Sequence, residues 1–351
     1  MKVIPIHLNA NVQSLIVVSS MDATTPLLED RLTPIEAVRR WGKTTSDALL
    51  DPSCHKFQIP SVKGFIGYRL QNGCAVVLGD PVCEEKDIPE LVQAFHLTSA
   101  QQSMPVLYLI VSQSFAEWAM EHLTSTAIEF GKEMFLDPYH DPQNKSGTKA
   151  SLVRRKVKHA LKEGVTAEEY LPSDLEIERQ IEEVGREWLK SRHGPQVHTS
   201  QIKIFDNRLG KRWFYARYEE RIIGVLILNQ IQVKQGALLN RYMVLPGVPG
   251  GVPELLISTA IRCLREEDCH FLSLGIVPSD KLGRIQGLNP LAAWICRTLF
   301  KVAVRLFRLR GHMGFWEKFQ PEQEPCYILL SQPRFRLKEL LALSQALNMH
   351  L

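Results

Sequence analysis

Two apolar strands in this chain end in glycine- and proline-rich loops that lead into helices, and these two junctions set the main limits on its fold. The first lies within "NGCAVVLGDPVC" at residues 72–83, where Gly79, Asp80 and Pro81 end a buried run. The second lies within "LLNRYMVLPGVPGGVPELLI" at residues 238–257. A carboxylate between two residues that break regular structure indicates a backbone held open around something. We expect Gly79 and Pro81 to shape the turn, and Asp80 to cap the next segment or meet a cation.

The elements predicted around the first loop form a short α/β unit. An Asn-Gly turn at 71–73 predicts a hairpin ahead of the loop, because this dipeptide is the strongest short-range hairpin signal. The other elements expected there are a helix opened by Thr33 and Pro34, a helix over 86–102, the strand 105–112, a helix over 114–127 and the strand 133–137. Residues 138–150 are turn formers and solvated residues. They mark a linker between a domain over 1–140 and a domain over 141–351.

The second half gives the same order at greater length. It predicts two helices, three antiparallel strands, the second loop with its helix, a strand, a helical region to about residue 310 and a last strand. This order resembles that of the GNAT acyltransferase fold. In that fold a central strand splays from its neighbour, and the loop after it presents N–H groups to a ligand at a helix N-terminus. On this interpretation the two loops occupy equivalent places in two related halves.

Composition limits the class of protein. A length of 351 residues exceeds one ordinary core and suits two domains. The net charge of +4 is mild, so a nucleic-acid or membrane role has to come from local clusters of charge. No run approaches the ~18 to 20 apolar residues of a membrane span, and the first residues predict no signal peptide. The seven cysteines contain no CxxC pair, which indicates a cytoplasmic, reduced protein without a metal.

Several motifs resemble one family. "YRLQNGCAVVLGDPV" at 68–82 is similar to the "YR…G…ALGDPVG" signature of the C-terminal catalytic domain of phosphatidylglycerol lysyltransferases, also called multiple peptide resistance factors. "FLSLGIVP" at 271–278 resembles that family's "FSLGMAPL", and "WEKFQPEQEPCYILL" at 316–330 resembles its "KEKF.P.WEPRYL". The resemblance covers roughly residues 60–330.

The resemblance implies an α/β protein of two tandem GNAT-like domains, with mixed, mostly antiparallel sheets flanked by helices. It implies transfer of an aminoacyl group from aminoacyl-tRNA to a lipid hydroxyl, as in phosphatidylglycerol, with no cofactor beyond the charged tRNA. It also implies a stand-alone member that lacks the membrane-spanning half. Two positions depart from the family pattern: Leu238 stands where the family has Asp, and Cys326 stands where it has Arg.

The resemblance also implies the reacting residues. Arg241 would stabilise the oxyanion or position the acceptor, and otherwise is a surface arginine in an ion pair. Glu324 would bind the α-ammonium or relay a proton, from a place just before a last strand expected to neighbour the strand of Arg241. Lys318 is a further catalytic candidate, with an ordinary helix surface as its alternative. The expected substrate-binding residues are Gly79, Asp80, Pro81, Gly250, Gly251 and Tyr327, although the paired glycines could serve the turn alone.

Two basic helices complete the predicted sites. The first carries Arg154, Arg155, Lys158 and Lys162, and could contact the phosphates of tRNA or be a solvated face. The second carries Arg297, Lys301, Arg305 and Arg308 and no acid over 291–310. Helices of this kind lie at membrane interfaces, so this one could bind anionic lipid peripherally at the inner face of the membrane. The alternative is an amphipathic helix packed on its own domain.

Two other functions fit part of the sequence. An acyl-CoA N-acyltransferase would share the fold, but Leu245 stands where the pyrophosphate loop of that class begins with Gln or Arg. A non-catalytic protein could keep only affinity for tRNA or membranes, and the loss of Asp at Leu238 favours it. The amino acid and the acceptor are not specified by the sequence.

Overall fold

Helices and strands alternate through the chain much as the sequence predicts. The structure, a computed structural model, describes residues 32–171, 174–191, 204–306, 310–333 and 337–346, all within one compact unit. Its α-helices are α1 (Pro34–Trp41), α2 (Ile88–Gln101), α3 (Gln113–His122), α4 (Thr148–Lys162), α5 (Leu175–Lys190), α6 (Val252–Glu266), α7 (Pro290–Leu306), α8 (Arg310–Glu317) and α9 (Leu337–Ala346). Its strands are β1 (His55–Phe57), β2 (Gly64–Gln71), β3 (Cys74–Leu78), β4 (Val82–Cys83), β5 (Val106–Val111), β6 (Thr126–Leu136), β7 (Thr166–Tyr170), β8 (Lys211–Tyr218), β9 (Arg221–Ile231), β10 (Gly236–Val244), β11 (Leu272–Pro278), β12 (Ile285–Gln286) and β13 (Glu322–Leu330).

Local signals in the sequence form the expected structures. Asn72 and Gly73 take positive φ values of 48° and 68°, as the tight turn between β2 and β3 requires. Thr33 caps α1 in a reciprocal capping box with Glu36, and Pro34 follows at the start of the helix. The hairpin and the first helix are therefore confirmed.

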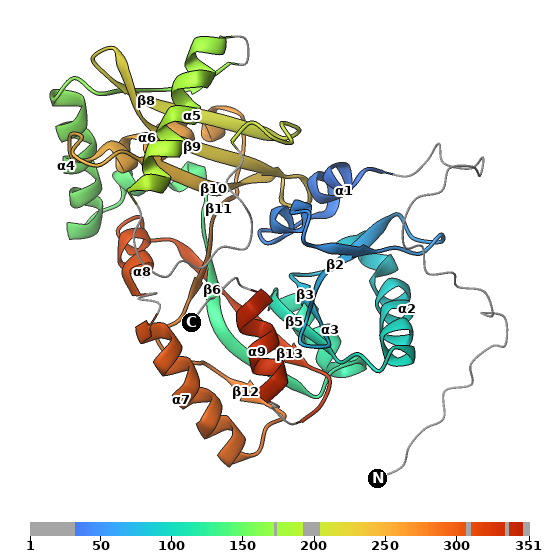
Figure 1. The fold of residues 1–351 in the computed structure, drawn as a ribbon. Coiled ribbons are helices and arrows are strands. Elements are labelled where there is room, and N and C mark those ends of the chain that lie inside the picture. Colours follow the sequence, from blue (N-terminus) through green and yellow to red (C-terminus); the bar gives the residue numbers. More distant parts are fainter. Residues whose placement is uncertain (1–31, 172–173, 192–203, 307–309, 334–336, 347–351) are drawn as a thin grey trace, which may run out of the picture. The chain divides into compact units, whose positions relative to one another are not determined.

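One mixed sheet runs through both halves of the chain. Its strand order is β1-β2-β3-β5-β13-β6-β11-β10-β9-β8-β7, with β12 paired to β6 and β4 to β2 (Figure 1). Among the strands that the structure describes, only β3–β5 and β10–β11 are parallel neighbours. A mixed, mostly antiparallel sheet flanked by helices confirms the predicted fold class.

The last strand of each half is exchanged. β13 ends the second half of the chain, but it lies between β5 and β6 of the first half. β6 in turn pairs with β11 of the second half. The sheet therefore crosses the predicted domain boundary at residue 140, and each half depends on the other for a strand. The division into domains over 1–140 and 141–351 stays a prediction.

One strand pair splays apart, as expected for the GNAT fold. β10 and β11 pair only at Ala237–Leu272 and Leu238–Ser273, and the second glycine- and proline-rich loop follows β10. The splay expected ahead of the first loop is not seen, because β3 stays paired with β5 to its end and the Gly79 N–H donates to the Leu109 carbonyl at 2.8 Å.

The two faces of the sheet carry different helices. One face, called here the α5 face, packs α1, α7 and α9 in one apolar group and α5 in a second. The other, called the α6 face, packs α4, α6 and α8 in one group and α2 and α3 in another. The polar residues described below lie on the α5 face, between its two groups.

Several predicted boundaries need correction. The helix predicted over 114–127 ends at His122, because the β-branched Thr126 and Ile128 begin β6. The strand predicted over 133–137 is correspondingly longer. β7 lies between α4 and α5, where no strand was predicted, since its two central glutamates obscure the pattern of an edge strand. α9 was not predicted either.

Candidate functional site

A polar row crosses the α5 face where its two apolar groups meet. Register places Glu324 of β13 opposite Glu133 of β6. It places Leu238 of β10 opposite both Ser273 of β11 and Asn229 of β9. Side chains opposite one another in neighbouring strands share a face. The hydroxyl of Ser273 donates to Glu133 Oε1 at 2.8 Å, which joins the two parts of the row.

Thr44 covers this row. It follows α1 in the chain, and its hydroxyl donates to Glu133 and lies 3.1 Å from Ser273 Oγ. Both hydroxyl contacts to Glu133 use one carboxylate oxygen, Oε1. Within the described residues, no hydrogen bond or ion pair engages the Glu133 Oε2 atom.

Carboxylates gather at the β6–β13 end of this row. Burial and the nearby carboxylates of Glu133, Asp80 and Glu324 raise the pKa of Cys326 to about 12. Cys326 occupies the position at which the resembled family has arginine, so a neutral thiol stands where a cation would otherwise offset these charges. This end of the row therefore offers a favourable environment for a cationic group.

Arg241 is directed to the same face by a β-bulge. In a regular strand, residues three apart point to opposite faces, but an irregularity between Leu239 and Arg241 pairs Arg241 with Ile227. Ile227 and Asn229 share a face, so Arg241 shares the face of Leu238. Burial lowers the pKa of the Arg241 guanidinium. Among the described residues the guanidinium has no hydrogen-bond or ion-pair partner.

The segment that carries Thr44 is fastened to both halves. Arg39 of α1 is buried, donates to the carbonyl of Leu209 at 2.6 Å and pairs with Asp47 at 2.6 Å. Asp47 in turn accepts from Asn240, the residue before Arg241. The loop over the polar row is thus positioned by contacts to β10 and to the chain before β8.

The first glycine- and proline-rich loop forms an internal ion pair. Asp80 is 5% exposed and accepts from Lys43 Nζ at 2.7 Å and from the backbone N–H of Ser112 at 2.9 Å. Of the two roles predicted for Asp80, the one that forms is contact with a cation. Gly79 has a φ of 73°, and a Cβ there would lie 2.0 Å from the Thr45 hydroxyl. Pro81 is buried beside it.

The paired glycines of the second loop accommodate a helix. Gly251 has a φ of 99°, and a Cβ there would lie 2.1 Å from the carbonyl oxygen of Lys156 on α4. A Cβ at Gly250 would lie 3.5 Å from His159 of α4. The backbone of α4 therefore lies against the N-terminus of α6, and Gly251 permits that close packing, whereas Gly250 has room for a side chain.

Lys318 and Tyr327 lie away from Arg241. Lys318 forms an ion pair of 2.5 Å with the buried Glu254 of α6 and lies 3.7 Å from the Phe315 ring centre. Burial lowers the pKa of Lys318, and its bond to Glu254 opposes that shift. Tyr327 packs with the group of α2 and α3. Both side chains belong to the α6 face.

The predicted neighbourhood of Glu324 and Arg241 is wrong. β11 and β6 lie between β13 and β10, because the last strand is exchanged into the first half. Glu324 is also within β13 rather than before it, and its side chain is exposed. The structure brings Glu133, not Glu324, to the strand next to β11.

The basic residues of α4 divide into two sets. Arg154 donates to the carbonyls of Gln143 and Lys145, so it holds the preceding loop. Arg155, Lys158 and Lys162 are exposed opposite the buried face of the helix. These three form no ion pair within the described residues.

α7 presents an apolar ridge to solvent. Its exposed large apolar residues are Leu291 (68%), Trp294 (64%), Ile295 (43%), Leu299 (41%) and Val302 (59%). At 100° per residue these five fall on one side of the helix, beside Lys301 and Arg305. Arg297 donates to the carbonyls of Leu282 and Gly283 and so fastens the helix. Arg308 lies outside the described residues.

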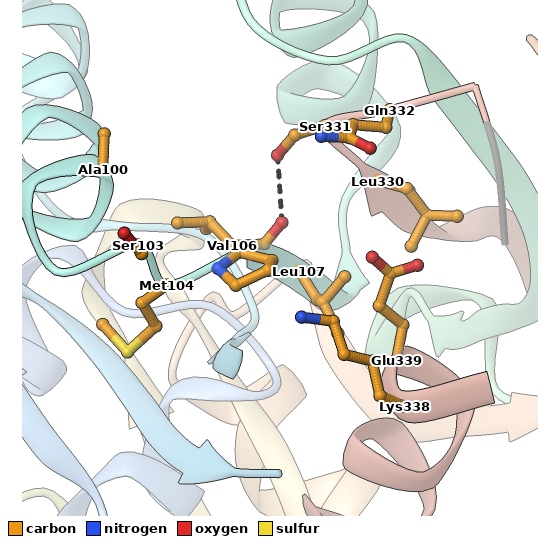
Figure 2. Close-up of a pocket in the computed structure, with 11 residues that line it drawn as sticks. Ala100, Ser103, Met104, Val106, Leu107, Leu330, Ser331, Gln332, Lys338 and Glu339 are labelled. Atoms are coloured by element: carbon orange, nitrogen blue, oxygen red, sulfur yellow. Dashed lines mark hydrogen bonds between the residues drawn. The ribbon is translucent and has the colours of Figure 1, made fainter. Parts of the chain in front are cut away.

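None of the helices described is both long and apolar enough to cross a bilayer. A cavity of about 280 Å³ lies elsewhere, between the start of β5, the end of β13 and α9 (Figure 2). Ser331 donates to the Val106 carbonyl beside it. None of the predicted site residues lines it in the described part of the chain. The cavity lies at the start of β5, whereas Ser112 follows the last residue of that strand.

Comparison with known proteins decides the family. Residues 37–330 match the family model described as phosphatidylglycerol lysyltransferase, C-terminal. The chain belongs to this family. The match spans the polar row, both loops and both basic helices, so these features are parts of one family domain.

Individual relatives agree in fold. An MprF-like domain protein of Mycobacterium tuberculosis is 23% identical over 298 residues, which cover 80% of this chain and 59% of that protein. A C-terminal domain assigned to a lysylphosphatidylglycerol synthetase from Agrobacterium fabrum has a TM-score of 0.71 at 20% identity, over 89% of this chain and 95% of that one. The L-PGS structure from Bacillus licheniformis has a TM-score of 0.70 at 17% identity, over 90% of this chain and 96% of that one. These likenesses show the fold.

Sequence reasoning missed Thr44, Glu133 and Ser273. Ser273 lies within the family-like "FLSLGIVP" segment, which was the one available signal. Thr44 and Glu133 lie in stretches that resemble ordinary loop and strand. Only the strand order reveals them, because the residues are far apart in the sequence. Thr44 and Glu133 are 89 residues apart, Glu133 and Ser273 are 140 apart, and Thr44 and Ser273 are 229 apart.

Proposed function

We propose that this chain transfers an aminoacyl group from aminoacyl-tRNA to the hydroxyl of a lipid. The observation that carries the proposal is Arg241, a partly buried guanidinium directed by a bulge to the polar row, beside the β10–β11 splay. Family membership supports the reaction class. The arrangement suits an ester that is already activated and needs orientation and stabilisation of charge.

The transfer proceeds by attack of the acceptor hydroxyl on the ester carbonyl carbon. A new carbon–oxygen bond forms, negative charge grows on the carbonyl oxygen, and the bond to the ribose oxygen of tRNA breaks. Arg241 stabilises the charged oxygen. The proton of the acceptor hydroxyl passes to the departing ribose oxygen, so the overall reaction consumes no other reagent.

The direct test is formation of the product. The protein is incubated with a pool of charged tRNAs and a total lipid extract, and the lipids are separated and stained with ninhydrin. We expect a new amine-bearing lipid that requires both the charged tRNA and the protein. No new lipid with any preparation of charged tRNA would contradict the proposal.

The acyl-CoA alternative is less well supported. A pyrophosphate cradle needs open backbone N–H groups at the N-terminus of the helix after the splayed strand. Here α4 packs against Gly251 at that place. Saturable quenching of tryptophan fluorescence by acetyl-CoA would nevertheless favour that alternative.

We propose that the exposed basic set on α4 binds tRNA. Reversing the charge of Arg155, Lys158 and Lys162 together should weaken tRNA binding and reduce the slope of log affinity against log salt by about two to three, since each lost phosphate contact removes about 0.7 to 0.9. The measurement is filter binding over a range of salt concentrations. The matched control reverses Arg179, Arg186 and Lys190 on α5, and should keep the wild-type slope. Equal slopes in both variants would assign α4 to simple solvation.

We also propose that α7 rests on a membrane surface that contains anionic lipid. Replacing Trp294 and Val302 with glutamate should abolish sedimentation with phosphatidylglycerol vesicles, because each buried apolar side chain contributes roughly 1.5–3 kcal/mol. Reversing Lys301 and Arg305 should instead remove the preference for anionic over neutral vesicles. Arg297→Gln serves as the control, since Arg297 binds carbonyls of its own chain. Failure of the wild-type protein to sediment at low salt would exclude this role for α7.

A further inference from the structure

Two opposite charges on the α5 face lack a charged partner. Glu133 forms no ion pair and Arg241 forms neither an ion pair nor a hydrogen bond within the described residues. They do not pair with each other. Charged groups removed from water are usually paired or bound to a ligand. An unpaired anion and an unpaired cation on one face therefore suggest a ligand that carries both kinds of charge.

Asn229 gives an independent sign of a missing group. Its side chain is 1% exposed, and neither its amide nitrogen nor its amide oxygen has a hydrogen-bond partner among the described residues. Buried amides are almost always hydrogen-bonded. Register directs Asn229 to the face of Leu238 and Ser273, and Ser273 donates to Glu133. The same row thus holds an unsatisfied amide as well as an unpaired carboxylate.

An aminoacyl ester carries both kinds of charge. Its α-ammonium is bonded to the carbon next to the ester carbonyl, so a cation and a growing oxyanion occur within a few bonds of each other. We infer that Glu133 binds the α-ammonium of the aminoacyl group while Arg241 faces the ester oxygen. This inference rests on the proposed aminoacyl transfer and identifies the residue that holds the donor.

Thr44 and Ser273 position the carboxylate for this role. Both hydroxyls contact Oε1, which leaves Oε2 without a partner in the described part of the chain. Glu324 adds negative charge on the next strand, and Cys326 supplies no competing cation. The β6–β13 end of the site is thereby suited to an ammonium.

The test compares three forms of one tRNA pool: aminoacylated, discharged with mild base, and aminoacylated then acetylated at the α-amine. Filter binding measures affinity of the full-length protein for each form, and amino-acid analysis identifies what is retained. We expect the free-amine form to bind about 10- to 100-fold more tightly than the acetylated form, as for a hydrogen bond to a charged group. Glu133→Gln should remove this difference while retaining affinity for discharged tRNA.

Two variants keep the result interpretable. Glu266→Gln alters an exposed carboxylate of α6 and should preserve the difference. Ser273→Ala removes one hydroxyl that positions Glu133 and should reduce the difference without abolishing it. If wild-type protein binds tRNA but treats the three forms alike, or if Glu133→Gln still discriminates, the inference is overturned. If no form of tRNA binds, the proposed function fails as well.

Discussion

Arg241→Met is expected to lower the rate of aminoacyl-lipid formation by about 10²- to 10³-fold, the usual cost of losing one donor to a developing oxyanion. The variant should melt at the wild-type temperature or slightly above it. Arg241 is partly buried and makes no ion pair or hydrogen bond among the described residues, so its removal leaves no partner unsatisfied. The measurement is product formation in a single turnover, with a thermal melt of the same preparation.

A control separates a local effect from a general loss of charge. Arg217 lies on β8 and its guanidinium stands over the Tyr215 ring at 5.6 Å, so Arg217→Met removes an equal charge from the same sheet. This control should stay within about twofold of wild type, as surface substitutions usually do. Full activity in Arg241→Met, or a loss that follows a fall in melting temperature, would show that Arg241 does not act on the reaction.

The sequence predicts those parts of the fold that depend on neighbouring residues. The Asn72–Gly73 hairpin, the cap at Thr33 and the basic helix α4 each follow from local backbone preference or periodicity. Resemblance to the family supplied Arg241, while glycine and proline residues at the ends of apolar strands supplied both loops. These features need no knowledge of which strands are neighbours.

Which residues meet in the site depends on the order of the strands in the sheet, and the hydrophobic periodicity of the sequence does not predict that order. Glu324 was expected beside Arg241 because the final strand was expected to neighbour the strand of Arg241, as in the GNAT fold. The exchange of β13 moves Glu324 to the far side of β6 and places Glu133 near the splay instead. The bulge that directs Arg241 to the α5 face is likewise a property of pairing and not of the residues of β10 alone.

The strand exchange predicts that neither half of the chain folds alone. Expressed separately, the fragments 1–147 and 148–351 should each give no cooperative thermal transition, whereas the two expressed together should copurify in equal amounts and melt as one unit. Without β13, the first fragment leaves β5 and β6 without the strand between them. Without β6, the second leaves β11 with an open edge.

The two halves depend on each other through buried apolar side chains as well as through strand pairing. Leu329 and Leu330 of β13 are 0% and 1% exposed, and Met134 and Leu136 of β6 are 0% and 2% exposed. Leu329 and Leu330 lie in two apolar groups built mainly by the first half, and Met134 and Leu136 lie in one built mainly by the second half. Losing two large apolar side chains costs roughly 3–6 kcal/mol at 1.5–3 kcal/mol each, a large part of the 5–15 kcal/mol that holds a typical protein folded.

A matched point variant, Leu329→Asp, should therefore destabilise the intact chain strongly, while Glu322→Asp at the exposed start of the same strand should not. A cooperative melt from either fragment alone would mean that the halves are independent domains and that the exchange contributes little to folding.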